Sequence, residues 1–423
     1  MRIIDSKEIK KSFFEQVGFD VSSQVEAIIK KVRKYGDRAI FAFTKEFDGV
    51  QLKKLKVEKT QLESATKKLS KSEFEAIWQA KKNIETFAKA QRSTFTDFEI
   101  ETERGVFCSQ RVIPVGSACV YVPGGNYPLV SSVLMGVIPA KVAGVGGIIV
   151  CTPPNKDGQI HPAILAACKM CGVKEVYKVG GAQAIAAAAF GTESIEPVDM
   201  IVGPGNAYVA EAKRQVFGRV GIDFVAGPSE ILVIADESGD AALIAADLLA
   251  QAEHDVNASA VLLTCSPRFA KAVAKEVESQ LKTLKTKQIA QVSIAKNGLI
   301  VLCKSPADMV NISNQKAPEH LHLHLKNVAK ILAKLTNYGS VFVGQECCEA
   351  LGDYSAGINH ILPTAGAARY SSGLSVKHFL KLTTGLRVNR PEKVGKSSME
   401  LAKMEGLDAH RKSVGMRLHR NEN

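Results

Sequence analysis

A glutamine and a histidine lie three residues apart at the end of an apolar helix that the sequence predicts over 241–252. Residues at this spacing share one face of a helix, so Gln251 and His254 would point the same way. An amide oxygen and an imidazole nitrogen together would form half of a zinc site. The alternative is a helix end where Gln251 is solvated and His254 interacts favourably with the helix dipole. The rest of the chain must therefore supply the other ligands, a base and a ligand pocket.

A carboxylic acid stands beside an imidazole in the sequence Ala-Pro-Glu-His that ends at His320. Glu319 and His320 are suited to general acid–base chemistry, although such a pair is a weak signal when it stands alone. Two further histidines, His322 and His324, follow at alternate positions. If this segment is helical, positions two apart point to different faces, and we expect both side chains at the surface.

A polar, glycine-rich segment, GDYSAGINHILPT, covers residues 352–364. Loops of this composition carry function more often than they build a core. Within it, Asp353 is a candidate metal ligand and His360 is a candidate substrate contact. Near the C-terminus the sequence EGLDAH adds Glu405 and His410 as a further carboxylate and imidazole.

Three Gly-rich turns follow predicted strands, at 123–125, 180–183 and 203–206. Turns after parallel strands meet at the carboxyl edge of the sheet, where open α/β folds bind ligands. Glycines let backbone N–H groups approach a bound group, and the helix N-termini that follow favour anions. None of the turns has the full G-x-G-x-x-G pattern. Two alternatives stay open, a dinucleotide site of another kind and glycines that only close tight turns.

Strands and helices alternate through most of the chain and must position these residues. Residues 21–91 have helical periodicity, and residues 99–123 contain short strand-like runs. Strands alternating with helices then run from about residue 131 to 217 and resume over 231–344. This pattern predicts the α/β class, with two Rossmann-like doubly wound parallel-sheet domains, a helical N-terminal region and a helical C-terminal tail.

Composition and charge describe a globular protein of ordinary hydropathy. The 423 residues are 46% hydrophobic, with a mean hydropathy of +0.01 and a net charge of +12. The positive charge is spread along the chain without an arginine-rich arm, so we expect no nucleic-acid partner. No segment has the pattern of a signal peptide or a membrane span, so we expect no membrane contact. Nine cysteines without a regular framework predict a reducing compartment, the cytoplasm, and Cys168 and Cys171 are interpreted as buried thiols.

Taken together, the motifs resemble the histidinol dehydrogenase family over about residues 21–410. The stretches that carry the resemblance are VYVPGG, GGAQAIAA, GPGNAYVAEAKRQV, AGPSEILVIAD, DLLAQAEHD, APEHL, GDYSAGINHILPT and EGLDAH. Their combination is highly specific, whereas any one of them alone is not. The family carries out the last two oxidations of histidine biosynthesis, from L-histidinol through a bound aldehyde to L-histidine, with reduction of two NAD.

The resemblance implies a role for individual residues of this sequence. It implies one Zn²⁺ per subunit, held by Gln251, His254, Asp353 and His410. It implies an acid–base pair made of Glu319 and His320. It implies contacts to L-histidinol from Ser229, Gln251, His254, His320, Asp353, His360, Glu405 and His410. It implies contacts to NAD from Tyr121, Gln183 and Asn206, which lie in or beside the Gly-rich turns.

The resemblance also implies a homodimer in which each active site takes Glu405 and His410 from the partner subunit. The residues agree, because the basic sequence after residue 371 has few apolar side chains for a core of its own. We therefore expect an N-terminal arm (1–20) and a first α/β domain with the metal and catalytic residues (21–120 with 229–371). A second α/β domain on the NAD side (121–228) and a helical tail that reaches the partner (372–423) complete the chain.

Three other functions compete with this interpretation. A relative could oxidise another small primary alcohol, but Ser229 and the Glu405 to His410 spacing favour histidinol. A zinc hydrolase could use the metal, Glu319 and water without any nicotinamide, but it does not need three Gly-rich turns. A basic binding protein with a degenerate site would not keep a chemically competent residue at every polar candidate position.

Overall fold

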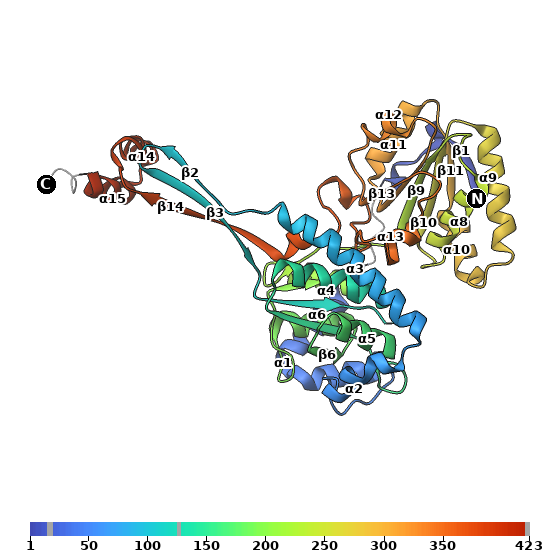
Figure 1. Ribbon diagram of the computed structural model, residues 1–423, viewed down its shortest axis with the longest axis horizontal. Helices are drawn as coiled ribbons and strands as arrows, with labels where there is room; N and C mark the ends of the chain where they lie inside the picture. Colours follow the sequence, from blue (N-terminus) through green and yellow to red (C-terminus); the bar gives the residue numbers. More distant parts are fainter. Residues whose placement is uncertain (15–19, 125–127, 419–423) are drawn as a thin grey trace.

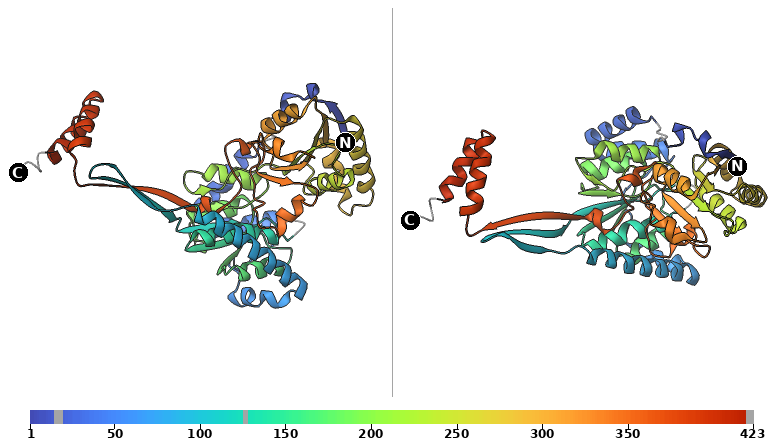
Figure 2. Two further views of the ribbon diagram at one scale, coloured as in Figure 1. Left: turned by 45° about the horizontal axis from the view of Figure 1, so that its top comes forward. Right: turned by 90° about the horizontal axis from the view of Figure 1, so that it is seen from above.

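The computed structural model describes residues 1–14, 20–124 and 128–418, and it has two α/β domains and a long arm (Figures 1 and 2). Both domains contain a purely parallel sheet with helices on its two faces. This architecture confirms the predicted α/β class. In the part of the chain that the structure describes, no helix is both long enough and apolar enough to cross a membrane.

The first domain is built on a six-stranded sheet. Its strands, in spatial order, are β1 (Arg2–Asp5), β11 (Leu299–Leu302), β10 (Ser259–Thr264), β9 (Glu230–Ala235), β12 (His320–His324) and β13 (Ser340–Val343). One face is covered by α8 (Ala241–Ala252), α9 (Pro267–Leu281) and α10 (Lys287–Asn297), and the other by α11 (Pro306–Lys316) and α12 (Val328–Leu332). Because both faces are covered, β9 is buried along its whole length, as expected of a central parallel strand.

The second domain is built on a five-stranded sheet. Its strands, in spatial order, are β6 (Glu175–Lys178), β5 (Gly147–Thr152), β4 (Ser117–Tyr121), β7 (Met200–Val202) and β8 (Gly221–Ile222). One core contains α2 (Lys59–Ser64), α3 (Lys71–Ser93), α4 (Val130–Ala143) and α5 (Pro162–Met170). The opposite core contains α1 (Ser22–Phe47), α6 (Gly181–Phe190) and α7 (Ala207–Val216).

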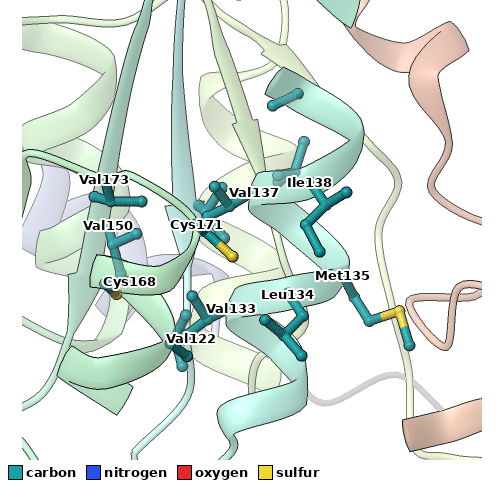
Figure 3. Close-up of a cluster of buried hydrophobic side chains, with 14 of the residues drawn as sticks. Val122, Val133, Leu134, Met135, Val137, Ile138, Val150, Cys168, Cys171 and Val173 are labelled. Carbon is teal, nitrogen blue, oxygen red and sulfur yellow. The ribbon is translucent and has the colours of Figure 1, made fainter. Parts of the chain in front are cut away.

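Helices α4 and α5 bury the C-x-x-C thiols in the core of the second domain (Figure 3). Cys168 and Cys171 lie among apolar side chains that include Val133 of α4 and Val150 of β5. Burial raises the pKa of the Cys171 thiol to about 12. The prediction of buried thiols at this motif is confirmed.

The expected domain boundaries are wrong at the N-terminal side. Helix α1 packs on α6, and Val25 shares a core with Ala184, so the helices of residues 22–93 belong with the second sheet and not with 229–371, and residues 98–114 form strands of the arm. The start of the expected N-terminal arm belongs to the first domain, because β1 pairs in parallel with β11 at the edge of the first sheet. An amphipathic helix shows which of its faces is buried but not which sheet covers it, so periodicity could not assign these helices.

The arm is a three-stranded antiparallel sheet that ends in two helices. Its strands are β2 (Phe98–Glu103), β3 (Val106–Pro114) and β14 (Leu380–Val388), in the order β14-β3-β2. At its far end, α14 (Glu392–Met404) and α15 (Asp408–Leu418) pack on each other, away from both domains (Figures 1 and 2). The expected all-helical tail is therefore wrong over 380–388, where pairing with β3 overrides local helical periodicity.

The remaining helix, α13 (Glu349–Tyr354), follows β13 in the first domain. Short 3₁₀ turns cover Ser6–Glu8, Lys11–Phe13, Ala65–Lys68, Ala367–Arg369 and Val376–Phe379.

Candidate active site

His320 lies at the start of β12, between β9 and β13, with three carboxyl groups around its imidazole. Its Nδ1 is 3.7 Å from Glu319 and 3.8 Å from Glu349, and its Nε2 is 3.6 Å from an Asp353 oxygen. His320, Glu319 and Glu349 are all buried. The structure thus joins the predicted acid–base pair to the predicted ligand Asp353 and adds one carboxylate, Glu349.

Burial raises the pKa values of the two glutamates, whereas for His320 the neighbouring carboxylates outweigh burial and raise the pKa of the imidazole. Burial raises the pKa of Glu319 and of Glu349 to about 8 each. Burial alone would lower the pKa of His320, but Glu349, Glu319 and Asp353 together raise it to about 10. Neighbouring acid and base groups with pKa values shifted this far are typical of acid–base catalytic sites.

Glu319 is fixed in place by the start of the neighbouring strand. Its Oε2 accepts a hydrogen bond of 2.9 Å from the backbone N–H of Glu230, the first residue of β9. Ser229 directly precedes Glu230, so the predicted substrate contact lies at the same strand end. Glu230 is itself held by Lys316 at 2.8 Å and by the backbone N–H of Ala365 at 2.8 Å. These hydrogen bonds and the ion pair link Glu319 to its surroundings at the amino edge of the first sheet, where β9 and β12 begin.

A group of candidate metal ligands lies beside His320. His254, Glu349 and Asp353 each offer a ligand atom within 4.8 Å of the others. Helix α8 ends at Ala252, and the backbone N–H of His254 donates to the Gln251 carbonyl at 3.3 Å. With its nitrogen toward Glu349, the buried Gln251 amide donates to both carboxylate oxygens, at 2.9 and 2.5 Å. This orientation leaves the amide oxygen of Gln251 as the atom that can bind a metal.

His360 joins this group from the loop after α13. Its Nδ1 donates to the backbone carbonyl of Asp353 at 2.8 Å. Burial lowers the pKa of His360 below its usual value, so the ring is neutral. A neutral ring that donates through Nδ1 keeps an acceptor at Nε2, which suits it to contact a substrate N–H or O–H group.

The sequence interpretation missed Glu349, which carries part of the site. Helix α13 starts at Glu349 and places Asp353 four residues later, so both carboxylates lie on one helix face. That spacing is visible in the sequence and could have revealed the residue. Glu349 was missed because it lies three residues before the recognised stretch that begins at Gly352, and the two cysteines before it have no partner motif.

The three residues expected to contact NAD lie at the carboxyl edge of the second sheet, at the end of β4 and the starts of α6 and α7. The Tyr121 hydroxyl, at the end of β4, accepts a hydrogen bond of 3.1 Å from the Gly181 N–H at the start of α6. Gln183 is buried, and its Oε1 has no hydrogen-bond partner among the described residues. Asn206 caps α7 through its Oδ1, which accepts from two backbone N–H groups. The turn at 123–125 lies partly outside the described residues, since they do not include Gly125.

A buried ion pair is hydrogen-bonded to Gly203, in the turn before Asn206. Lys213 pairs with Asp223, and both are almost fully buried. The Lys213 Nζ donates to the Gly203 carbonyl at 3.0 Å, while the Gly203 N–H donates to Asp223 at 2.9 Å. Gly203 has φ +122, and any side chain there would collide with the Tyr121 carbonyl. This glycine is therefore required by the close approach of two strand ends.

Two predicted site residues are not near the others within one chain. Glu405 follows the end of α14 and His410 lies in α15, at the far end of the arm (Figure 1). Both side chains are exposed.

The expectation that His322 and His324 are surface residues is wrong. Both belong to β12 and are buried, and both face Asp247 of α8. The segment is a strand, in which positions two apart point to the same face. The alternation His-Leu-His-Leu-His has the period of a strand, and a helix was the wrong assumption.

Glycine-rich turns on one parallel sheet and a buried imidazole among carboxyl groups on another define a two-domain α/β oxidoreductase. A family model described as histidinol dehydrogenase matches residues 14–418. The chain therefore belongs to the histidinol dehydrogenase family.

Individual relatives agree with this assignment. The chain is 47% identical over 414 residues to a histidinol dehydrogenase of Listeria monocytogenes serovar 1/2a, covering 97% of this chain and 96% of the relative. It is 47% identical over 405 residues to a histidinol dehydrogenase of Bacillus thuringiensis, covering 95% and 94%. The crystal structure of histidinol dehydrogenase from Elizabethkingia anophelis superposes with a TM-score of 0.93 at 38% identity, covering 98% of this chain and 96% of that one.

Proposed function

We propose that this protein oxidises L-histidinol to L-histidine through L-histidinaldehyde that stays bound, with two NAD as hydride acceptors and one Zn²⁺ per subunit in the active site. The observation that carries the proposal is the position of His320, which lies within 4 Å of Glu319 and Asp353. One imidazole thereby connects an acid–base group to a group of metal ligands. Family membership supplies the substrate, because the relatives are named for it.

The donor atoms of the site suit zinc. His254 and Asp353 offer nitrogen and oxygen ligands within 4.8 Å of each other, and the Gln251 amide oxygen is free to join them. His410 of the partner subunit would be the fourth ligand, which gives the N/O set that Zn²⁺ accepts. A zinc ion held there would fix the orientation of the amino alcohol, and it would offset part of the Asp353 charge that raises the pKa of His320.

The chain's own residues would move the protons. In the first oxidation the alcohol O–H proton passes to His320 while the carbinol carbon loses hydride to NAD. Glu319 then takes a proton from water while the water oxygen adds to the aldehyde carbon, and His320 gives the proton it gained to the carbonyl oxygen, which yields a geminal diol and restores neutral His320. In the second oxidation a diol O–H proton passes to His320 and the same carbon loses a second hydride to another NAD. Such positioned proton transfers each contribute roughly 10²–10⁴ in rate.

The second domain would hold NAD. Tyr121, Gln183 and Asn206 stand at the carboxyl edge of its sheet, where doubly wound folds bind dinucleotides. The buried Gln183 Oε1 without a partner among the described residues is suited to accept a hydrogen bond from the cofactor. A side chain at Gly203 would collide with the Tyr121 carbonyl, so the glycine lets the turn after β7 lie close to the end of β4.

A homodimer with shared active sites would explain the arm. Leu386, Leu401 and Met404 are large apolar side chains that one chain leaves 70%, 55% and 74% exposed. Burying them on a partner would carry Glu405 and His410 of the partner subunit to the metal and substrate. All nine cysteines are free thiols, which supports the reducing cytoplasm as the location.

Absorbance of NADH formed from limiting L-histidinol tests the proposal. We expect two NADH per histidinol, loss of the reaction with a chelator, and recovery when zinc is added back. One NADH per histidinol would mean that the aldehyde leaves, which contradicts the role given to Glu319. No NADH from folded, zinc-loaded protein would reject histidinol and direct the search to other small primary alcohols, and then to hydrolysis.

A further inference from the structure

A second cluster of ligand atoms lies deeper between α8 and β12 and is not used by the reaction. It consists of Asp247, His322 and His324. Both imidazoles are buried, and the Asp247 side chain is 12% exposed. Asp247 stands one helical turn before Gln251, and His322 stands two strand positions after His320. The cluster is therefore displaced from the proposed active site by about 6 Å, toward the start of α8 and the end of β12.

The three ligand atoms form a triangle of the size that a tetrahedral metal imposes. Asp247 Oδ2 is 3.1 Å from His322 Nδ1 and 3.6 Å from His324 Nε2. The two ring nitrogens are 3.3 Å apart. Zinc bonds of about 2.0–2.1 Å to nitrogen and oxygen place neighbouring ligands of a tetrahedron about 3.3–3.4 Å apart. All three edges of the cluster lie close to that separation.

The hydrogen bond of His322 also has the pattern of a metal ligand. Its Nε2 lies 3.2 Å from the Gly344 carbonyl oxygen, to which a ring N–H can only donate. The other ring nitrogen, Nδ1, then faces both the Asp247 carboxylate at 3.1 Å and His324 Nε2 at 3.3 Å. A proton or a metal ion shared among these three atoms would satisfy them, and their nearly equal separations suit a metal ion. Metal-binding histidines commonly donate their second ring N–H to a carbonyl in this way.

We propose that Asp247, His322 and His324 form a second metal site, selective for a borderline divalent transition metal such as Zn²⁺ or Co²⁺. Two imidazoles and one carboxylate suit these ions and do not suit Mg²⁺ or Ca²⁺, which prefer all-oxygen ligands. Asp247 is the part-exposed member, so the ion enters from its side. An ion there ties α8 to β12, the two elements that carry Gln251 and His320, and so acts as a structural support for the active site.

The test counts Co²⁺ bound to the full-length protein after metal removal, reloading and gel filtration, by elemental mass spectrometry. Wild-type protein is expected to hold two Co²⁺ per chain. His324→Gln and Asp247→Asn each remove a ligand of the second site, and each is expected to hold one. His161→Gln removes an exposed imidazole outside both clusters and is expected to hold two.

Asp353→Asn separates this inference from the proposed function, because it removes a ligand of the active site only. We expect it to hold one Co²⁺, and the same chain with His324→Gln added to hold none. Wild-type protein with a single ion that Asp353→Asn loses and His324→Gln keeps would overturn the second site and leave the proposed function intact. The reverse pattern would uphold the second site and contradict the active-site zinc.

Thermal unfolding shows whether each variant is folded. Asp247→Asn nearly preserves the shape of the side chain, so it keeps the test valid if His324→Gln fails to fold. If two ions remain bound in both His324→Gln and Asp247→Asn, the cluster is a hydrogen-bonded network without a metal, and the proposal is wrong.

Discussion

At the scale of single residues, two buried carboxyl groups lie near the same imidazole nitrogen, Nδ1 of His320, but have different hydrogen-bond partners. Glu319 is held by a backbone N–H of β9, whereas Glu349 accepts from the Gln251 amide. The first is suited to move a proton and the second to position a metal ligand. This division of roles predicts two variants with different defects.

Glu319→Gln is expected to separate the two oxidations. Glutamine can still accept the Glu230 N–H, but it cannot take a proton from water. We expect the first oxidation to stay within about tenfold of wild type and the second to fall by roughly 10²–10⁴. NADH yield per histidinol would drop from two to one, with aldehyde trapped by semicarbazide. An equal loss of both steps would contradict the assignment of Glu319 to the water.

Glu349→Gln is expected to weaken metal retention. A glutamine cannot accept both N–H groups of the Gln251 amide, so the amide oxygen is no longer fixed toward the metal. Residues that orient a metal ligand typically contribute about 10–100-fold in affinity. Competition with a chelator measures the change, and Glu346→Gln on the exposed surface is the matched control. Unchanged retention in Glu349→Gln would show that Gln251 is held by other means.

Replacing Asp48 by asparagine is expected to stabilise the protein, and more so as the pH rises. Burial raises the pKa of Asp48 to about 6, and one of its oxygens has no hydrogen-bond partner among the described residues. Since the folded state binds this proton more tightly than the unfolded state, stability falls as pH rises from about 4 to about 6. Asp48→Asn removes that loss, and we expect a gain of about 1 kcal/mol at pH 7 after solvent screening. Urea unfolding along this pH range should show a gap that widens with pH, and a constant gap would contradict the cause.

At the scale of elements, the ion pair behind the Gly203 turn links stability to cofactor binding. Lys213→Met leaves Asp223 buried without its cation and is expected to cost about 3–5 kcal/mol of unfolding free energy. The turn would also lose the hydrogen bond from Lys213 to Gly203, so the KM for NAD should rise. Urea unfolding and initial rates measure the two effects. Lys54→Met breaks an exposed pair with Glu58, and this control should change stability by less than about 1 kcal/mol.

Individual strands and helices could be predicted from the sequence more reliably than the contacts between distant parts of the chain. Strands with Gly turns and the groups at Gln251, His254, Glu319 and Asp353 were visible, because each depends on local pattern or short spacing. The sheet that α1 covers and the pairing of Lys213 with Asp223 depend on contacts that no local pattern encodes. His322 and His324 were misplaced for a different reason, because the segment was assumed to be helical although its alternation fits a strand.

At the scale of the whole molecule, the arm is the part that one chain does not explain. It extends from the second domain (Figure 2). Apolar side chains on β14 and α14 are exposed, among them Leu386 and Met404. Exposed apolar surface of this kind marks an interaction site. Because the end of the arm also carries Glu405 and His410, an isolated chain has the proposed acid–base group but lacks two proposed contacts.

Mixing two inactive variants tests whether the arm completes the partner's site. His410→Asn and Asp353→Asn each remove one proposed zinc ligand, and each alone should be inactive. If a site takes Asp353 from one subunit and His410 from the other, a mixed dimer has one intact site and one with both lesions. A random equal mixture contains half mixed dimers, so about a quarter of wild-type activity should return after joint refolding. Sites completed within one chain would regain none, because every chain in the mixture lacks one ligand.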